Sequence, residues 1–578
     1  MAHHGWVSVE DPATLTPNGL KAPFGRLFPA EHATFDSLGI SLFAGPAGPL
    51  LEKPQVTKKS NPAGFTFLGQ FIDHDLTEFR VIGSGLQIID QNPTIGQRQK
   101  VLEDLFDPAE ELPTTTNGRT GKLDLDSVYG LLGTTQSDLF NAKGEFDLET
   151  RPGTTKPDLK RGAAYRNGRL IADPRNDENK LVVQIHMLFE LLHNKIHAAS
   201  GGPFSPAFQQ TRRTVQAIYR NIVFFDYLPR IVQRKHIEAV LAKFEKGTSL
   251  FQASNRRNDG ILRKLNLHDK AIADAVAIPV EFSHAVFRLG HSQLLPGYHL
   301  SGASGGVRLF HTGAIDPAQK TPSAPTGTDP ADPAPPKKPR DLRGNEALYD
   351  ADPNDSFDFH VDWKHFFVTT PPVKTPPKPS TTPQHGQPID GHLADSIFRL
   401  PPPSIGEPPQ SLAERNIRRG IDFGLPSGQS AAAQLAEAGY EDIDAMQRSD
   451  LFPAAPFTKF ADVLAREPRL ALDTPLWYYI LKEAERLTNI QQLGAVGGLI
   501  VAETLIGTLL EAEVDDITEK GRANAIRAAA AQRINDLKKW TDVEANEVDP
   551  HHILYFDRKL THANEIHTMG QLIRYLQA

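Results

Sequence analysis

Apolar residues recur at helical spacing along much of this chain. Between residues 181 and 197 they follow a period of about 3.6 residues, which predicts a strong amphipathic helix. The same kind of pattern predicts helices in 205–244, 279–295, 431–438, 480–487 and 520–538, and a last one from residue 562. The apolar run 493–510 contains Glu503 and four glycines, so we expect a buried glycine-rich helix there and no membrane span. The fold is therefore expected to be mainly α.

Three segments interrupt the helical pattern. Residues 1–60 are rich in proline and glycine and have few periodic apolar positions, which predicts an N-terminal surface arm. Seven prolines fall in 321–340 and seven in 371–388, so Pro-rich insertions are expected at about 313–343 and about 370–409. Between them, 358–369 is apolar and aromatic enough to pack. We expect a single large catalytic domain over 61–578 that carries both insertions.

Composition excludes several classes of site. The chain has 62 basic and 70 acidic residues and no long run of either sign, so neither nucleic acid nor an anionic membrane is an expected partner. It has no cysteine, which excludes disulfides, iron–sulfur clusters, cysteine zinc sites and thiolate-bound haem. The first residues show no basic start and no apolar core, and thus no secretory signal. We expect a soluble protein without a transmembrane segment, cytoplasmic or exported by a leaderless route.

One apolar segment, 64–80, contains a cluster of polar residues. The stretch GQFIDHDL places Gln70, Asp73, His74 and Asp75 among apolar neighbours, and burying them is costly unless each has a partner. A helix end with satisfied polar groups would explain the cluster without any activity. However, the stretch resembles the distal-histidine motif of the animal-type haem peroxidases, within the peroxidase–cyclooxygenase superfamily. That resemblance implies a large helical domain with few short strands and long loops, and it makes His74 the distal base and Gln70 a distal residue associated with halide and water.

Two further motifs follow in the order that this family has. Arg175, in 173–179 just before the helix at 181, is similar to the catalytic arginine of the family; alone it would be read as a helix-start ion pair. The stretch HAVFRLGH at 284–291 resembles the proximal motif, which makes His291 the axial ligand of the haem iron. Arg288 precedes it by three residues, where cyclooxygenases carry a radical-forming tyrosine.

The remaining resemblance concerns groups that hold the cofactor. In AERNIRRG at 413–420, Asn416 matches the asparagine that orients the axial histidine, and Arg419 matches a propionate-binding arginine. Asp73 and Glu178 stand where animal members form ester bonds to haem b, so such links are open here. Asn179 replaces the methionine of a third link, which cannot form.

A calcium site is also implied by the resemblance. Hard cations take six to eight oxygen ligands, and carboxylates alternating with carbonyls supply them. The family's ligands correspond here to Asp75, Thr120, Lys122 through its carbonyl, Asp124 and Asp126. Asp126 stands in place of the usual serine. Without Asp75, the loop DLDSVYG would be an ordinary polar turn.

The function implied is a haem peroxidase that reduces H2O2 and oxidises small phenolic donors or halides through a ferryl intermediate, an activity suited to oxidative stress. Two alternatives remain open. One is a fatty-acid dioxygenase of the same superfamily, disfavoured by Arg288. The other is a di-iron carboxylate protein, because Glu190-x-x-His193 and Glu281-x-x-His284 have the spacing of its ligands, although matching partner glutamates are lacking. A structural protein that has lost activity is disfavoured by the joint presence of the four motifs. Oligomeric state and the physiological donor are not indicated.

Overall fold

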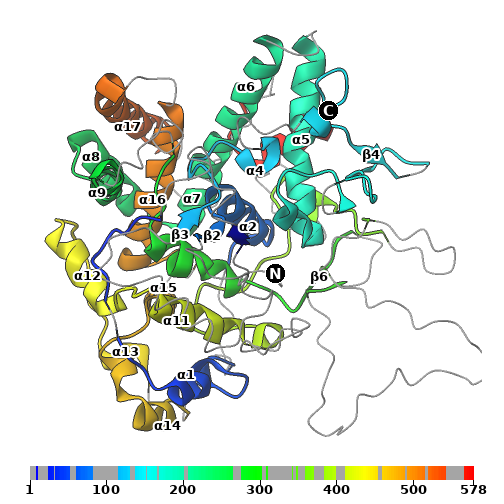
Figure 1. Cartoon of the computed structure of the whole chain (residues 1–578). Helices are drawn as coiled ribbons and strands as arrows, with labels where there is room; N and C mark the ends of the chain where they lie inside the picture. Colours follow the sequence, from blue (N-terminus) through cyan, green and yellow to red (C-terminus); the bar gives the residue numbers. More distant parts are fainter. Residues whose placement is uncertain are drawn as a thin grey trace, which may run out of the picture.

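The computed structural model describes residues 8–10, 24–31, 33–51, 60–82, 115–130, 137–151, 153–165, 168–200, 206–264, 275–301, 307–309, 342, 347–348, 358–369, 383–398, 411–453, 459–487, 491–514, 519–541 and 565–577. Helices dominate, as the sequence predicted. Figure 1 shows α2 (Gly64–Leu76) near the middle of the molecule, with α5 (Lys180–Ser200) and α6 (Pro206–Ile222) above it and α11 (Leu412–Asp422) below.

Two of these helices, α2 and α5, form the centre of the core. They contact each other, and Phe71 of α2 stacks on Phe189 of α5 with ring centroids 5.3 Å apart. Tyr219 of α6 meets both rings edge to face, an arrangement that aromatic pairs favour. The helix predicted at 181–197 is therefore confirmed, and it packs against the face of α2 that carries Phe71.

The segment after residue 279 is helical but not α-helical. It begins with a π turn, η7 (Glu281–Ala285), and continues as a 3-10 turn, η8 (Val286–His291). The wider and then tighter winding changes the angular spacing of its side chains from the α period that the sequence suggested. η7 packs against α11, and η8 packs against both α2 and α15 (Leu476–Glu485). The segment thus lies between the distal helix α2 and the lower helices.

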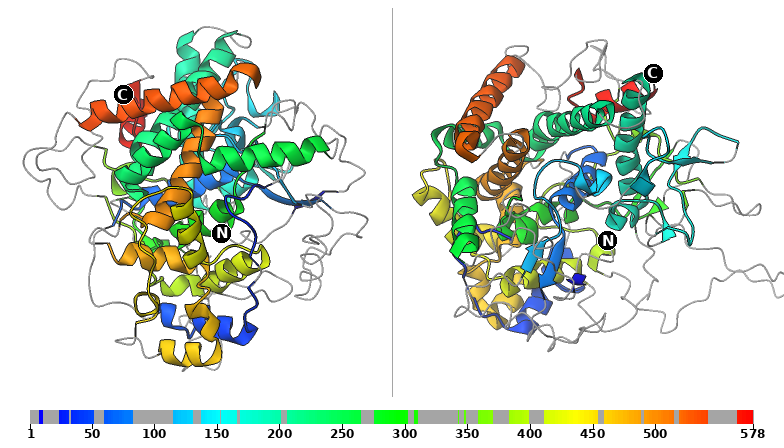
Figure 2. Two further views of the ribbon diagram at one scale, coloured as in Figure 1. Left: turned by 90° about the vertical axis from the view of Figure 1, so that its left-hand side faces the viewer. Right: turned by 45° about the horizontal axis from the view of Figure 1, so that its top comes forward.

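The glycine-rich helix is buried, as expected. It is α16 (Ala495–Glu513), which is apolar around most of its circumference and contacts α8 (Arg234–Lys246) and α17 (Glu519–Thr541). A Cβ at Gly507 would lie 2.3 Å from the ring of Phe251, so only glycine allows this close approach. Among the described helices, α16 is the one long and apolar enough to cross a membrane, yet 83% of that window is buried inside the fold. Figure 2 shows α17 crossing α16 on the outer side.

The expectation of a surface arm is wrong for residues 24–51. Leu27, Phe28, Phe43 and Leu50 are buried in the main core, although no period links them. α1 (Ser37–Ala44) begins at Asp36, whose side chain accepts the Gly39 N–H, and it packs on α11 and α14 (Lys459–Arg466). Isolated apolar residues here fill gaps between helices that are distant in sequence, which periodicity does not reveal.

The expected Pro-rich insertions lie outside the described residues except for Leu342 and 383–398. In the latter segment Ile389, Leu393 and Ile397 are buried, so this part packs into the core and is not a surface insertion. The segment 358–369 packs as predicted, with Phe366 and Phe367 buried.

The remaining elements are short strands and further helices. The strands pair as β1–β2–β3, β4–β5 and β6–β7, with β1 and β2 parallel and the others antiparallel. Their bounds are β1 Ser8–Glu10, β2 Phe79–Ile82, β3 Thr115–Asn117, β4 Glu149–Thr150, β5 Pro157–Asp158, β6 Gly297–Tyr298 and β7 Val307–Arg308. The other α-helices are α4 Asp126–Tyr129, α7 Leu228–Ile231, α9 Leu250–Lys264, α12 Gly428–Glu437, α13 Arg448–Leu451 and α18 Met569–Gln577. The other 3-10 or π turns are η2 Pro49–Leu51, η3 Ser137–Leu139, η5 Pro174–Asp177, η6 Val223–Tyr227, η9 Trp363–His365, η11 Asp395–Phe398 and η12 Pro468–Ala471.

Candidate functional site

His74 lies in the last turn of α2 and is 2% exposed. Its Nδ1 is 2.9 Å from Oδ1 of Asn176, which belongs to η5 just before α5. Burial, with a smaller contribution from the positive charge of Arg175, lowers the pKa of His74 to about 3. The imidazole is therefore neutral at physiological pH. A neutral imidazole with one nitrogen held by a neighbour is suited to accept a proton at the other.

Arg175 is fixed against the end of the same helix. Its Nη2 donates to the carbonyl of His74 at 2.8 Å, and its Nη1 donates to the carbonyl of Thr77 at 2.6 Å. The carboxylate of Asp173 accepts from Nε and Nη2 of the guanidinium. Asp173 also pairs with Arg119, so two arginines share one buried carboxylate and hold the pKa of Asp173 far below its usual range. The predicted pair His74 and Arg175 is thus adjacent, with Arg175 bound to the backbone behind the histidine.

Gln70 lies one turn before His74 on α2. Both its amide atoms, Nε2 and Oε1, are buried without a hydrogen-bond partner among the described residues. Such unsatisfied groups are rare in folded proteins and call for an explanation, such as a bound group or water. Residues four apart share a helix face, so this amide lies on the His74 face of α2. A site built to hold a polar ligand or cofactor beside His74 accounts for this amide.

His291 is held on the other side, at the end of η8. Its Nδ1 lies 2.8 Å from the Nδ2 of Asn416 in α11, so the predicted pair is in direct contact. Burial and the nearby Arg288 lower the pKa of His291 to about 3. Ser411 caps α11 by accepting the Glu414 N–H, which helps to start the helix that presents Asn416. The indole N–H of Trp477 donates to the Arg288 carbonyl at 3.2 Å and anchors η8 to α15.

Two partly buried arginines, Arg288 and Arg419, lie near the carboxyl group of Asp73. Burial, reinforced by the positive charge of Arg288, lowers the pKa of Arg419 to about 9. Asp73 attracts both guanidinium groups, and burial raises the pKa of its own carboxyl. One carboxylate beside two arginines leaves local positive charge that a further anion would balance. The two carboxylates of a haem have this charge, so the donor set fits the group that the sequence motifs imply.

The two carboxyl groups expected near the cofactor edges are only partly buried. Asp73 accepts from the hydroxyl of Thr77 at 3.1 Å, and Glu178 follows η5, where its N–H donates to the carbonyl of Arg175. Burial raises the pKa of both carboxyls. A raised pKa favours the neutral acid.

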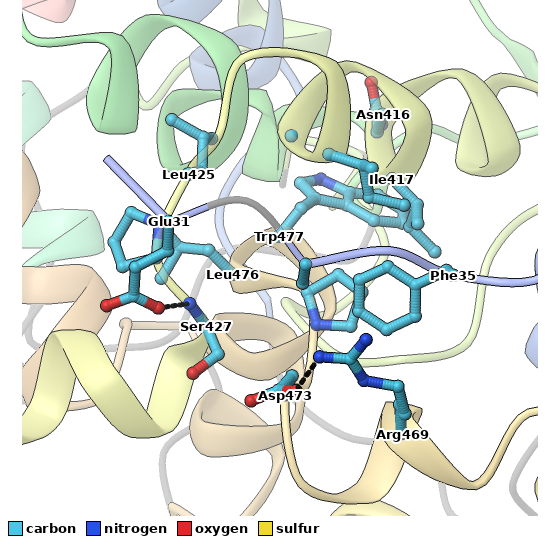
Figure 3. Close-up of a pocket in the computed structure, with 15 residues that line it drawn as sticks. Glu31, Phe35, Asn416, Ile417, Leu425, Ser427, Arg469, Asp473, Leu476 and Trp477 are labelled. Carbon is cyan, nitrogen blue, oxygen red and sulfur yellow. Dashed lines mark hydrogen bonds and ion pairs between the residues drawn. The ribbon is translucent and has the colours of Figure 1, made fainter. Parts of the chain in front are cut away.

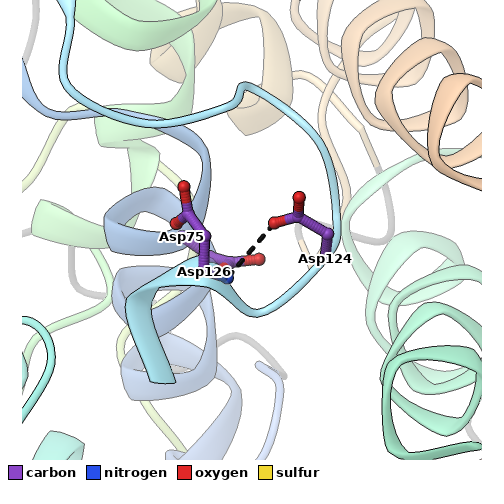
Figure 4. Close-up of side chains that lie close together, drawn as sticks. All are labelled: Asp75, Asp124 and Asp126. Atoms are coloured by element: carbon purple, nitrogen blue, oxygen red, sulfur yellow. Dashed lines mark hydrogen bonds between the residues drawn. The ribbon is translucent and has the colours of Figure 1, made fainter. Parts of the chain in front are cut away.

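The predicted calcium ligands gather on another face of α2. Carboxylate oxygens of Asp75, Asp124 and Asp126 lie within 4.8 Å of one another (Figure 4). The hydroxyl of Thr120 donates to Asp124 at 3.0 Å, and the carbonyl of Lys122 accepts the Asp124 N–H at 2.9 Å. Burial and mutual repulsion raise the pKa of Asp75 well above its usual value and raise that of Asp126 to about 7. Three carboxyls in this state form a site that a cation would stabilise.

Several residues around this cluster were not found from the sequence. The hydroxyl and the N–H of Ser127 both donate to Asp75, at 3.0 and 3.2 Å. Arg119 contacts Asp126 at 3.4 Å and also pairs with Asp173, so it joins the acidic cluster to the carboxylate that holds Arg175. Ordinary ion-pair residues give no periodic or motif signal, so only the fold reveals this connection.

The two Glu-x-x-His motifs of the di-iron alternative do not meet. Glu190 accepts from His186 at 3.1 Å, whereas His193 bonds the hydroxyl of Tyr129 at 3.0 Å. Glu281 caps the backbone N–H groups of residues 27 and 28. Within the described part of the chain, the acidic cluster around Asp75 is the one group of three or more such side chains close enough to share a metal ion. The motif-based di-iron site is therefore excluded for these residues.

A cavity of about 280 Å³ opens on the proximal side, below α11 (Figure 3). Phe35, Ile417 and Trp477 form its apolar wall, and the pair Arg469–Asp473, at 3.2 Å, lies at its edge. Asn416 borders the same cavity, so the space lies directly behind the residue that contacts His291. The volume suits a single aromatic ring or a few waters.

The comparison with protein families agrees with the motifs. Residues 50–312 match the family model described as animal haem peroxidase. No curated protein matches the sequence. Among solved structures, similar ones are peroxidase A from Dictyostelium discoideum, with 16% identity, a TM-score of 0.49 and coverage of 90% of this chain and 93% of that chain. Fatty acid α-dioxygenase from Oryza sativa has 11% identity, a TM-score of 0.47 and coverage of 96% and 90%. The α-dioxygenase from Arabidopsis thaliana has 13% identity, a TM-score of 0.45 and coverage of 98% and 87%.

The matched segment contains the distal helix, the acidic cluster, Arg175 and His291, but it ends before Asn416 and Arg419. Those two residues are connected to the others by geometry, through the contact with His291 and the charge of Asp73. The family implies a haem cofactor and oxidoreductase chemistry. Over residues 50–312, the chain matches the animal haem peroxidase family.

Proposed function

We propose that this chain is a haem peroxidase that reduces H2O2 and oxidises small phenolic donors or halides. One observation carries the proposal: two buried, neutral histidines lie on packed segments, and an asparagine holds each of them. This is the arrangement that an iron ligand on one side and a proton acceptor on the other require. When bound, haem would supply an iron centre that takes oxidising equivalents from H2O2 and passes them to a donor.

His291 would hold the haem iron through Nε2, because its Nδ1 faces Asn416. Turning the Asn416 amide end for end brings Oδ1 to this position, where it accepts the Nδ1 proton and leaves a lone pair on Nε2. Arg419 and Arg288 would bind the carboxylates of the cofactor. Asp73 and Glu178 remain proposed sites of ester links, for which a raised carboxyl pKa is suitable.

His74 would transfer the protons of the reaction. Its Nε2 takes one proton from H2O2 and returns it to the oxygen that leaves as water. Arg175 provides a fixed positive charge beside this step, and Gln70 offers an amide donor and acceptor to the peroxide. Two phenols each supply one electron and one proton, so that H2O2 is reduced to two water molecules. A halide ion would instead take up one oxygen atom of H2O2 and a proton from solvent and leave as hypohalous acid, while the other oxygen leaves as water.

Calcium bound by Asp75, Thr120, the Lys122 carbonyl, Asp124 and Asp126 is part of the proposal. The raised pKa values of the three carboxyls support it, because a divalent cation removes their repulsion. One ligand has a competing partner, since Arg119 and the Thr120 N–H both contact the Asp126 carboxylate. Terbium luminescence, with Ca²⁺ as competitor, would test the site. Asp75→Asn should lose it, whereas no competition by Ca²⁺ would remove calcium from the proposal.

The function is tested by loading the full chain with haem and adding H2O2 with guaiacol or bromide. We expect donor oxidation that His74→Gln lowers by about 100-fold or more, because a general base contributes about 10²–10⁴. His291→Ala should abolish the Soret band of bound ferric haem. Oxygen consumption with a long-chain fatty acid, together with no peroxide-dependent donor oxidation, would replace the peroxidase with the dioxygenase. Acidified organic solvent would then show whether haem stays on the chain through Asp73 or Glu178.

A further inference from the structure

Behind His74 a chain of buried side chains runs into α5. The Nδ1 of His74 is 2.9 Å from Oδ1 of Asn176, and Nδ2 of Asn176 is 3.0 Å from Nδ1 of His186. The Nε2 of His186 is 3.1 Å from Oε1 of Glu190, one turn further along α5. All four residues are at most 2% exposed. The motifs of the haem site account for His74 but give no role to Asn176, His186 or Glu190.

The carboxylate at the far end gives every hydrogen bond a direction. Where the Glu190 carboxylate accepts at Oε1, His186 donates from Nε2 and its Nδ1 is left as an acceptor. That atom accepts from the amide N–H of Asn176, which turns Oδ1 of the amide toward His74. His74 must therefore donate from Nδ1 and keep its lone pair on Nε2. The orientation of Asn176 in the structure agrees with this sequence of donors and acceptors.

We propose that Glu190, acting through His186 and Asn176, fixes His74 in the tautomer that accepts a proton at Nε2. The three are positioning residues, and the inference rests on the proposed role of His74 as the proton acceptor. If each of these hydrogen bonds had the opposite donor and acceptor, Asn176 would present its N–H to His74. The histidine would then carry its proton on Nε2, and the general base would be blocked.

A purely structural role explains Glu190 less well. Its second oxygen, Oε2, is buried with no hydrogen-bond partner in the described part of the chain, so the buried carboxylate makes its one described hydrogen bond to His186. Burying a carboxylate under these conditions is unfavourable, and an apolar residue of similar size would stabilise the core more. A requirement for an acceptor at the end of the chain explains why a carboxylate is present.

The tautomer of His74 can be read directly in the full-length protein labelled with ¹⁵N-histidine, before haem is added. Comparison with His74→Gln assigns its two ring nitrogens. We expect the Nδ1–H form in the wild type and the Nε2–H form in Glu190→Leu. Glu190→Gln, whose carbonyl still accepts, should keep the Nδ1–H form. Glu483→Gln is the control, because this buried carboxylate accepts from backbone N–H groups of α16 and is not one of the hydrogen-bonded residues that lead to His74.

A double variant separates positioning from folding damage. The double variant Asn176→Asp/Glu190→Leu still has one buried carboxylate, but at position 176 and not at 190. This carboxylate lies between His74 and His186 and would accept from the Nδ1–H of both. We expect the Nδ1–H tautomer of His74 to return. In haem-loaded protein, the second-order rate constant with H2O2 should fall by about 100-fold in Glu190→Leu and recover in the double variant, with unchanged haem affinity.

The outcomes are distinct. If His74 keeps Nδ1–H in folded Glu190→Leu, or if the double variant behaves like Glu190→Leu, the inference is overturned. If Glu190→Leu does not fold, the double variant is compared with Asn176→Leu instead. The inference predicts that His74 has the Nδ1–H tautomer in the double variant and not in Asn176→Leu. If the tautomer changes as expected but His74→Gln reacts with H2O2 at the wild-type rate, the proposed function fails while the chain of hydrogen bonds stands.

Discussion

Without a cation at the proposed calcium site, the stability of this protein should depend on pH in an unusual direction. Burial raises the carboxyl pKa of Asp75, Asp124 and Asp126 in the ion-free fold, and repulsion from neighbouring carboxylates adds to it at Asp75 and Asp126. A raised pKa means that the folded state binds more protons than the unfolded state between the two pKa values. The free energy of unfolding therefore falls as pH rises through this window, instead of rising as it does for paired carboxylates.

The size of the effect follows from one residue. For Asp126 the pKa changes from 3.8 to about 7. That difference corresponds to about 4 kcal/mol of unfolding free energy, present below about pH 4 and lost by about pH 7. The proposed calcium ion would bind the ionised carboxylates and should therefore restore stability at the pH where the loss is greatest. At 100 times its dissociation constant it adds about 2.7 kcal/mol.

The assay is urea unfolding followed by circular dichroism, from about pH 5 to about pH 8, with EDTA and with excess Ca²⁺. Asp126→Asn is the matched control, because its amide can still accept from Arg119 while the repulsion is removed. We expect the EDTA curve of the wild type to fall with pH and that of Asp126→Asn to be flatter. The reasoning is refuted if the wild type and the variant have the same slope, or if Ca²⁺ adds no stability at about pH 8.

Three further changes test other parts of the site. Asn416→Leu leaves Nδ1 of His291 without its partner, so the unfolding free energy should fall by about 1–3 kcal/mol and the Soret band of the haem-loaded protein should shift; an unchanged spectrum would contradict the role of Asn416. Asp173→Ala leaves the buried Arg119 and the partly buried Arg175 without their shared carboxylate and should cost about 3–5 kcal/mol in urea unfolding, with Asp173→Asn intermediate. Gly420→Ala adds a methyl group 3.6 Å from Leu425 inside α11, and we expect it to stabilise the fold by about 0.5–1 kcal/mol; a loss of stability would show that the cavity beside α11 cannot accept it.

The sequence revealed the elements whose signals are local. The apolar period of α5 predicted its extent to within a few residues, and motif order predicted that His291 and Asn416 belong together although 125 positions separate them. The resemblance also grouped Asp75 with the loop of Asp124 and Asp126. These predictions succeeded because each depends on a fixed spacing within one segment or on a known order of segments.

What the sequence missed depends on contacts between segments. Leu27 and Phe28 fill gaps between helices, and no period marks them. The π and 3-10 turns of η7 and η8 follow from packing between α2 and α11, which overrides the α-helical pattern. The contacts of His186 with Asn176 and Glu190 depend on the relative position of η5 and α5, which the sequence does not give.

The geometry of α2 connects the two proposed centres. Successive residues on a helix point about 100° apart, so His74 and Asp75 face different sides of one rigid element. Asp75 joins the acidic cluster, whereas the carbonyl of His74 accepts from Arg175. A second route passes outside the helix, from Asp126 through Arg119 and Asp173 to that same arginine. Because both routes end at Arg175, we expect loss of a cation from the proposed site to change the positions of Arg175 and His74 together.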